Sequence, residues 1–336
     1  MKTRAALLSD PTLFRDKARG ALCGLAIGDS FGDASRNPNN QMAYGFTADF
    51  NKGASWSTDD TEFALLTAKI LIECQGQLTS QHVVDAWLCH VSTQDELKRG
   101  GASEFEASIN LRKGLRPPLS GRYNSYSHSD GAAMRIAPIG ILCAADVSRA
   151  IELARIDAEI SHDREGIWGA QAVAAAVAAA MADADIDEIW EAAMKAVPHD
   201  TWFYYAMEKA SALVEEANGD FLNAWMPLHD ELWTSYKASV CEAVVQAFGV
   251  LRLMHDDFRR GVILAGNFGR DADTIGAICG AVLGAKYGAS QIPHKWIEKT
   301  RYPTGTCLVF TKGLDVLEMA DSLSEIALTD PKKYLR

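Results

Sequence analysis

Residues 271–284 read Asp-Ala-Asp-Thr-Ile-Gly-Ala-Ile-Cys-Gly-Ala-Val-Leu-Gly. The run that follows the two aspartates is apolar, and its glycines at 276, 280 and 284 recur every four residues, so they share one face of a helix. A helix with such a face can pack closely against another backbone, because glycine has no side chain to hold the neighbour away. Close packing of this kind would seat the helix N-terminus, and its carboxylates, deep in the protein.

A second run of the same kind lies near the N-terminus. Between Phe14 and Gly28, charged and small apolar residues alternate at helical spacing, and Gly20, Gly24 and Gly28 again fall on one face. Residues 169–184 are rich in alanine and apolar on nearly every side, which predicts a buried central helix. Similar patterns predict helices over residues 62–73, 79–90, 132–145, 147–161, 187–196, 202–217, 240–253, 257–265 and 274–287.

Strand signals are weak throughout the sequence. No β-branched alternating run of useful length is present. Residues 100–130 are the least regular and include Pro117-Pro118, so we expect a long loop that covers a cleft. Glycine and proline mark no domain boundary. We therefore predict an all-α fold in which residues 1–336 form a single domain, a helical bundle.

Composition narrows the class of protein. The formal net charge is −11 and lysine and arginine form no block, which argues against a nucleic-acid surface. No apolar segment has the length and freedom from charge of a membrane span, and the N-terminus does not resemble a signal peptide. The seven cysteines are scattered without a C-x-x-C pair, as expected of reduced thiols. We expect a cytoplasmic protein that binds neither nucleic acid nor membrane. The sequence leaves its oligomeric state open, with a monomer as one alternative.

Two short acidic segments use the same residue types. Residues 58–61 read Thr-Asp-Asp-Thr and residues 271–274 read Asp-Ala-Asp-Thr, and each precedes an apolar helical run. One interpretation is that these residues simply cap helices, which is worth about 0.5–2 kcal/mol for each cap. On that interpretation the segments have no further role.

The alternative is a metal site. If the fold brings the two segments together, four carboxylates meet in one place, and buried ionised carboxylates need partners. Basic residues near the segments are few, and Arg270 is the only one directly adjacent. Divalent cations would then balance the charge, and a set of ligands made only of oxygen favours Mg²⁺, Mn²⁺ or Ca²⁺ over zinc. Two such cations would also activate water, which points to a hydrolase.

Six motifs in order resemble those of a known family. They are Gly-Asp-Ser-Phe-Gly at 28–32, Trp-Ser-Thr-Asp-Asp-Thr at 56–61, Gly-Ala-Ala-Met-Arg-Ile-Ala-Pro-Ile-Gly at 131–140, Ser-His at 161–162, Gly-Arg-Asp-Ala-Asp-Thr-Ile at 269–275, and Ile-Pro at 292–293 with Trp296. Together they resemble the ADP-ribosylglycohydrolase family, which includes the dinitrogenase reductase-activating glycohydrolase and ADP-ribosylarginine hydrolase. The similarity extends from about residue 17 to residue 300.

The resemblance implies an all-α orthogonal bundle that holds two divalent cations, Mg²⁺ or Mn²⁺. It implies hydrolysis of the N- or O-glycosidic bond between ADP-ribose and an acceptor, either a protein side chain such as arginine or a small molecule. By position, the implied metal ligands are Thr58, Asp59, Asp60, Asp271, Asp273 and Thr274, with Asp59 and Asp60 as the catalytic acids that orient or deprotonate water. The implied substrate-binding residues are Gly131, Met134, Arg135, His162, Gly269 and Arg270.

Two of these residues also have purely structural interpretations. Arg135 could contact a phosphate or pair with an acid in the core, and His162 could bind the ligand or complete a helix end.

Three departures from the family pattern bear on the substrate and the general base. Many members carry a glutamate soon after the first motif, whereas residues 33–38 contain none; Asp130 stands where an asparagine is familiar; and Glu62 follows Thr-Asp-Asp-Thr where many relatives have a neutral residue.

Two other functions remain open on the sequence. One is hydrolysis of a different N-ribosyl compound, such as a nucleoside. The other is a non-catalytic relative that binds ADP-ribose or is purely structural. The acids present in both segments argue against the non-catalytic alternative, because a structural protein has no need to gather like charges.

Overall fold

Over the residues that it describes, 1–50 and 57–329, the computed structural model contains helices and no strand. Ser129 and Ser239 form an isolated antiparallel bridge. Trp56 of the second motif lies outside the described residues. The α-helices are α1 (Arg4–Leu8), α2 (Pro11–Asp33), α3 (Pro38–Tyr44), α4 (Asp59–Glu73), α5 (Ser80–His90), α6 (Ala102–Arg112), α7 (Leu119–Arg122), α8 (Gly131–Met134), α9 (Ala137–Leu142), α10 (Val147–Ala158), α11 (Glu165–Met181), α12 (Ile186–Met194), α13 (Trp202–Glu216), α14 (Phe221–Glu231), α15 (Ala243–Leu253), α16 (Phe258–Gly266), α17 (Ala272–Tyr287), α18 (His294–Thr300) and α19 (Val316–Thr329).

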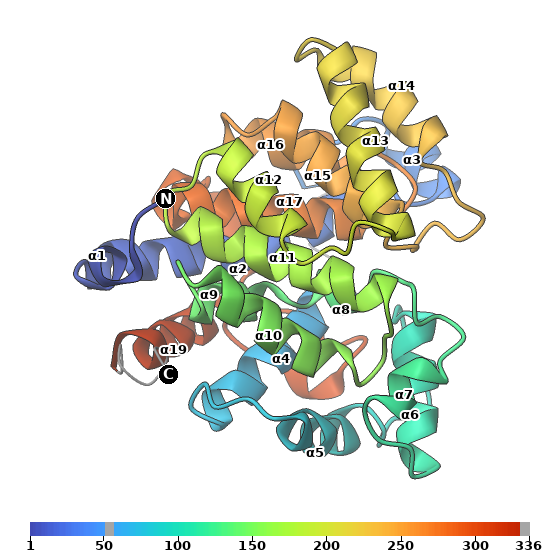
Figure 1. The fold of residues 1–336 in the computed structure, drawn as a ribbon, viewed down its shortest axis with the longest axis vertical. Helices are drawn as coiled ribbons and strands as arrows, with labels where there is room; N and C mark the ends of the chain where they lie inside the picture. Colours follow the sequence, from blue (N-terminus) through green and yellow to red (C-terminus); the bar gives the residue numbers. More distant parts are fainter. Residues whose placement is uncertain (51–56, 330–336) are drawn as a thin grey trace.

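Helices α2 and α17 lie side by side at the centre of the molecule (Figure 1). Their glycine faces meet directly, so that a Cβ on Gly24 would lie 2.1 Å from the carbonyl oxygen of Gly280. A Cβ on Gly20 would lie 2.2 Å from the carbonyl oxygen of Gly284, so the two helices run antiparallel. The close approach that the glycine spacing predicts is therefore confirmed, and the two runs are each other's partners. This arrangement places the C-terminal end of α2 beside the N-terminal end of α17.

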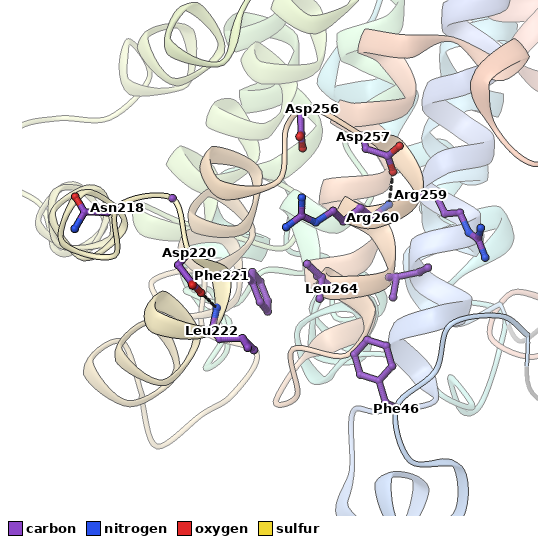
Figure 2. A pocket seen from close by; sticks show the side chains of 12 residues that line it. Phe46, Asn218, Asp220, Phe221, Leu222, Asp256, Asp257, Arg259, Arg260 and Leu264 are labelled. Atoms are coloured by element: carbon purple, nitrogen blue, oxygen red, sulfur yellow. Dashed lines mark hydrogen bonds between the residues drawn. The ribbon is translucent and has the colours of Figure 1, made fainter.

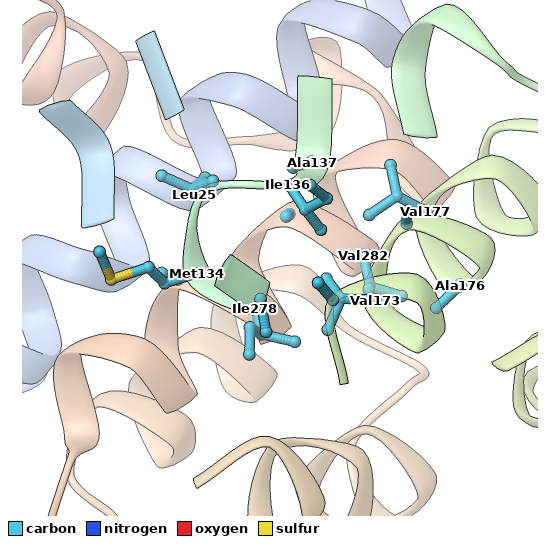
Figure 3. Close-up of a cluster of buried hydrophobic side chains, with 14 of the residues drawn as sticks. Leu25, Met134, Ile136, Ala137, Val173, Ala176, Val177, Ile278 and Val282 are labelled. Carbon is cyan, nitrogen blue, oxygen red and sulfur yellow. The ribbon is translucent and has the colours of Figure 1, made fainter. Parts of the chain in front are cut away.

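The alanine-rich helix α11 forms a second buried layer. It packs against α8, α9, α10, α12 and α17, and the central-helix prediction for this segment is confirmed. Figure 3 shows Val173, Ala176 and Val177 of α11 in one apolar cluster with Ile278 and Val282 of α17. Because alanine side chains are small, several helices can approach α11 closely. Helices α8 and α9 are among those that pack on it.

The remaining helices form two groups on either side of this core. Helices α12 to α16 lie on one side and α4 to α7 on the other, as Figure 1 shows. Helix α19 packs against α2, α4 and α9. In the part of the chain that the structure describes, no helix is both long enough and apolar enough to span a bilayer.

Two sequence predictions about helices were wrong. Residues 100–130 are not one loop, because α6 and α7 occupy much of the segment and bury Ala107 and Leu111. The helix predicted over 132–145 is broken into α8 and α9, since proline is unfavourable inside a helix and Pro138 stands in the first turn of α9. The sequence predictions also omitted α1, α3, α14, α18 and α19.

Candidate active site

The N-terminus of α4 is held by an acid from another helix. Asp29 of α2 accepts hydrogen bonds from the backbone N–H groups of Thr58, at 2.9 Å, and Thr61, at 3.2 Å. It also accepts from the Thr58 hydroxyl at 2.7 Å and the Thr61 hydroxyl at 2.5 Å. Asp29 is fully buried, so this contact fixes the first turn of α4 against α2.

The capping interpretation is correct for Thr58 alone among these candidate ligands. The Thr58 hydroxyl accepts from the backbone N–H of Asp60, at 3.3 Å, as an N-cap does. Asp271 stands at the N-cap of α17, but its side chain makes no capping hydrogen bond. Its carboxylate instead lies 2.9 Å from the Lys237 ammonium. The Asp271 carboxylate therefore does not cap α17.

The two acidic segments meet. Carboxylate oxygens of Asp29, Asp60 and Asp273 all lie within 4.8 Å of one another, and the three side chains are buried. Asp60 Oδ1 and Asp273 Oδ1 have no hydrogen-bond partner. Buried carboxylate oxygens without partners are costly in a folded protein, so the arrangement is suited to a ligand that brings positive charge.

Burial and mutual repulsion shift the pKa values of these acids. Desolvation is the largest cause in each case, and neighbouring carboxylates add to it. The pKa of Asp29 is raised to about 7, and the pKa values of Asp59 and Asp60 are raised well above their ordinary range. A cation bound among them would reverse this effect, because it stabilises the ionised form.

A cavity of about 250 Å³ opens onto the acids. Asp59, Asp60, Asp271, Asp273 and Thr274 line it, whereas Thr58 does not. Gly131 and Met134 of the predicted substrate-binding residues also line the cavity, and so do residues that the sequence predictions did not single out: Arg36, Arg99, Gly100, Gly101, Ala102, Ser103, Glu104, Ser129, Asp130, Tyr236, Lys237 and Ala238.

Glu104 is a fully buried acid of the cavity wall that the sequence predictions missed. It lies on α6, inside the segment predicted to be a loop, and accepts from the Ser103 hydroxyl at 2.8 Å. A Cβ on Gly131 would lie 2.1 Å from its Oε1, so the glycine of the third motif leaves room for this carboxylate. Burial raises the pKa of Glu104, and the charge of Glu104 in turn helps to raise the pKa of Asp59.

Arg135 does not line the cavity. Its fully buried guanidinium donates to Asp157 at 2.8 Å, to the carbonyl of Gly131 at 2.9 Å and to the Ser161 hydroxyl at 3.1 Å, and it lies 3.4 Å from Glu104. These contacts occupy every nitrogen of the side chain. The structure therefore favours the interpretation of Arg135 as a partner of core acids over that of a phosphate contact.

His162 is also fully buried and lies behind the cavity wall. Its ring nitrogens lie 2.9 Å from Ser129 Oγ and 2.7 Å from Ser161 Oγ. Ser129 donates to Ser103 at 2.8 Å, and Ser103 donates to Glu104, so a chain of hydrogen bonds joins His162 to the cavity. Burial lowers the pKa of His162 well below its ordinary value, so the ring is neutral.

Gly269 and Arg270 lie outside the cavity lining. Both have positive φ, at 91° and 58°, in the turn that leads into α17. The Arg270 side chain turns away from the acids and pairs with Glu242, with its Nε 2.5 Å from Glu242 Oε1. Their predicted contact with substrate stays a prediction, and the contacts that the structure shows are structural.

The sequence predictions also missed the basic residues of the site. Arg36 donates to Asp273, and Arg99 donates to Asp33. With Lys237, these residues bring positive charge to acids that seemed, from the sequence, to have only Arg270 nearby. Arg36 belongs to the segment 33–38, where the glutamate of many family members is absent. This departure from the family pattern was the feature of the sequence that could have pointed to Arg36.

Asp130 adds one more acid to the wall. It is buried, and its Oδ2 has no hydrogen-bond partner. Desolvation and then the charge of Asp271 raise its pKa well above the ordinary range. The sequence also marked this residue by a departure from the family pattern, because an aspartate precedes Gly131 where an asparagine is familiar.

A larger hollow, of about 1140 Å³, lies elsewhere on the surface (Figure 2). It is open and is formed by α14, α16 and Phe46, and it shares no residue with the acidic cavity. Two of its acids, Asp220 and Asp257, accept hydrogen bonds from the first turns of α14 and α16 and are ordinary helix caps. The hollow therefore lacks the gathered, unpartnered groups of the acidic cavity.

Comparison with known proteins assigns the chain to a family. The sequence model of the family described as ADP-ribosylglycohydrolase matches residues 10–332. The chain belongs to the ADP-ribosylglycohydrolase family. The resemblance inferred from the six motifs is therefore confirmed, and so is the all-α fold.

Relatives and a solved structure agree with this assignment. An uncharacterized protein of Archaeoglobus fulgidus is 30% identical over 295 residues, which cover 84% of this chain and 91% of that protein. An ADP-ribosylarginine hydrolase of Pseudomonas putida is 26% identical, with 90% of this chain and 78% of that protein covered. An ADP-ribosyl-[dinitrogen reductase] glycohydrolase of Rhodospirillum rubrum is 23% identical, with 84% and 90% covered. An ADP-ribosylglycohydrolase-related protein complex contains a chain with the same fold, at a TM-score of 0.65 and 23% identity, with 94% of this chain and 98% of that chain covered.

Proposed function

We propose that the chain hydrolyses the glycosidic bond between ADP-ribose and an acceptor in the acidic cavity, and that it needs divalent cations to do so. Membership of the ADP-ribosylglycohydrolase family supports the reaction class. The observation that carries the proposal is the convergence of buried Asp60 and Asp273 from opposite ends of the chain, each with an oxygen that has no partner.

The donor set fits a hard cation. Asp59, Asp60, Asp271, Asp273 and Thr274 line the cavity and offer only oxygen atoms, which Mg²⁺ and Mn²⁺ prefer as ligands. The remaining predicted ligand, Thr58, does not line the cavity, but its hydroxyl lies 3.1 Å from Asp60 Oδ2. Cations held by these residues would lower the pKa of a bound water, which would make a nucleophile available at neutral pH.

Asp59 and Asp60 have separate parts in this proposal. Asp59 faces the cavity beside Glu104, and in the metal-loaded site its carboxylate would be ionised and able to take a proton from water. Asp60 is more deeply buried, with one oxygen beside the Thr58 hydroxyl, and orients its free oxygen into the site. A ribosyl bond breaks through a state with positive charge near C1, which the surrounding carboxylates would stabilise.

The acceptor bound to ADP-ribose could be a protein side chain or a small molecule. The name of the Pseudomonas putida relative, ADP-ribosylarginine hydrolase, favours an arginine side chain. Asp130 supports the same choice, because a buried acid in the wall with an unpartnered oxygen is complementary to a cationic guanidinium. We therefore place ADP-ribosylarginine first among the substrates to test.

Release of free ADP-ribose tests the proposal. The substrates are ADP-ribose linked to arginine, ADP-ribose linked to serine, and a nucleoside, each assayed with Mg²⁺, with Mn²⁺ and with EDTA. We expect release from an ADP-ribosyl substrate that EDTA abolishes and added Mn²⁺ restores. Turnover of the nucleoside alone would favour a different N-ribosyl hydrolase, and ADP-ribose binding without turnover would favour a non-catalytic relative.

A further inference from the structure

The carboxylate oxygens of the cavity differ in what they contact. Asp60 Oδ1 and Asp273 Oδ1 have no hydrogen-bond partner, and both residues have a carboxylate oxygen close to that of Asp29. Asp271 and the second oxygen of Asp273 instead face basic side chains, since Lys237 lies 2.9 Å from Asp271 and Arg36 donates to Asp273 Oδ2. The positive charge that the sequence assigns entirely to metal is therefore supplied in part by the chain.

Arg36 is held in place by the fold around it. The preceding residue, Ser35, donates to the carbonyl of Gly266, and the Gln41 amide donates to the carbonyl of Ser35 at 2.8 Å. Lys237 lies 3.4 Å from the carbonyl of Arg36 itself. The Arg36 side chain is about three-quarters buried, with 26% exposed, and its Nε lies 3.3 Å from Asp33 Oδ1. The contact with Asp273 is thus built into the end of α2 and is not a loose surface pair.

The position of the guanidinium matters for how many cations the site can hold. In sites with two metal ions, the ions lie about 3.5–4 Å apart. A carboxylate that bridges such a pair presents one oxygen to each ion. Asp273 has one oxygen free, Oδ1, and the other is already bonded to Arg36. A guanidinium cannot lose its charge in a protein, so no change of pH within the stable range frees that oxygen.

We propose that Arg36 takes the place of one of the two cations expected from the family, so that the site binds a single divalent cation beside Asp60 Oδ1 and Asp273 Oδ1. This inference rests on the proposed metal dependence. Arg36 supplies positive charge and holds Asp273, but a guanidinium has no open coordination position and does not activate water. Water activation would then belong to one cation and the carboxylates around it.

Manganese binding tests the proposal without any assay of activity. Metal-free wild-type protein and its variants are titrated with Mn²⁺ by calorimetry, and bound manganese per chain is measured after gel filtration. The electron paramagnetic resonance spectrum distinguishes an isolated Mn²⁺ ion from two ions coupled through a bridging carboxylate. For wild type we expect one bound ion per chain and the spectrum of an isolated ion.

The variants separate the position of Arg36 from its charge. Arg36→Gln should free Asp273 Oδ2 and give a second bound ion with a coupled spectrum, whereas Arg36→Lys, which keeps the charge, should bind one ion. Arg99→Gln is the matched control, because it removes the same charge from the cavity wall but Arg99 contacts Asp33 and not Asp273. This control should also bind one ion.

The outcomes are distinct. Two coupled ions in wild type would overturn the inference while leaving the proposed function intact, and this measurement does not depend on whether any variant folds. A second ion in Arg99→Gln as well as in Arg36→Gln would overturn it too, because net charge rather than the Arg36 position would then decide the number. No binding of Mn²⁺ or Mg²⁺ by wild type would instead contradict the proposed metal dependence.

Discussion

The backbones of Gly28 and Gly276 touch, so closely that a Cβ on Gly28 would lie 1.8 Å from the carbonyl oxygen of Gly276. Asp29 follows the first glycine, and Asp273 stands one turn before the second. The contact between these two glycines therefore sets the separation of the acids that come from α2 and α17. The site depends on a backbone contact that no side chain could replace.

Alanine at position 28 should therefore destabilise the fold. The added methyl meets a backbone carbonyl, which cannot rotate aside, and overpacking of this kind costs about 1–3 kcal/mol or more. We expect a lower free energy of unfolding in urea, followed by circular dichroism. Gly249→Ala on α15 is the matched control, since its methyl meets the Leu228 side chain, at 3.0 Å, which can move. Equal stability of the two variants would show that the helices can separate without cost.

The two glycine runs show how far the sequence could predict this site. Spacing alone indicated that each run would pack against another backbone, and the resemblance of the motifs indicated the family. Neither could show that Asp29 would cap a helix from a distance, because that contact joins residues 29 positions apart through the fold. The predicted ligands Asp60 and Asp273 do meet, because both helices begin at the same place.

The residues that sequence reasoning missed have a common cause. Glu104 and Arg99 lie in or beside the segment predicted to be a loop, and no periodic pattern marked them as facing the acids. Arg36 lies beyond the end of α2, where helical periodicity no longer says which way a side chain points. In both places the orientation is decided by tertiary contacts, which a local pattern does not contain.

Removal of a cavity acid should abolish catalysis and leave the fold. We expect Asp59→Ala and Asp273→Ala each to lower the rate of ADP-ribose release by at least about 10²-fold, the usual contribution of a positioned acid or base. Helical content should be nearly unchanged by circular dichroism, because neither carboxylate caps its helix. Wild-type rates in either variant would contradict the assignment of the site.

An acid from the larger hollow provides the control. Asp256 lines that hollow, which shares no residue with the acidic cavity. Asp256→Ala should therefore leave ADP-ribose release unchanged. A loss of activity in this variant, with its fold intact, would move attention to the hollow of Figure 2.

Arg135 offers a test between a structural role and a phosphate contact. Arg135→Met leaves Asp157 and Glu104 without their buried partner, and loss of one member of a buried ion pair costs about 3–5 kcal/mol. We expect a large fall in the urea midpoint. Arg135→Lys should recover only part of it, because one ammonium cannot reproduce the forked contacts. A raised KM with unchanged stability would identify a phosphate contact instead.

The stability of the metal-free protein should fall as the pH rises, and bound metal should oppose this fall. The pKa of Asp29 is about 7 in the folded protein and has an ordinary value of 3.8, so the folded state holds the proton more tightly than the unfolded chain. Its contribution to stability is fully present below about pH 4 and is lost as the pH rises through about 7. Asp59 and Asp60 shift in the same direction and add to this loss.

A divalent cation binds the ionised carboxylates and competes with protons for them. The rise in Tm that Mn²⁺ produces should therefore be small at pH 5 and should grow as the pH approaches 8, because binding to the folded state alone stabilises it. Differential scanning calorimetry with Mn²⁺ and with EDTA at each pH measures this increment directly. Taking the difference removes the contribution of titrating groups outside the site. In Asp60→Asn the increment should be much smaller at every pH, since one free oxygen of the cluster is replaced by a neutral amide. An increment in wild type that stayed constant from pH 5 to 8 would mean that Mn²⁺ binds away from these acids.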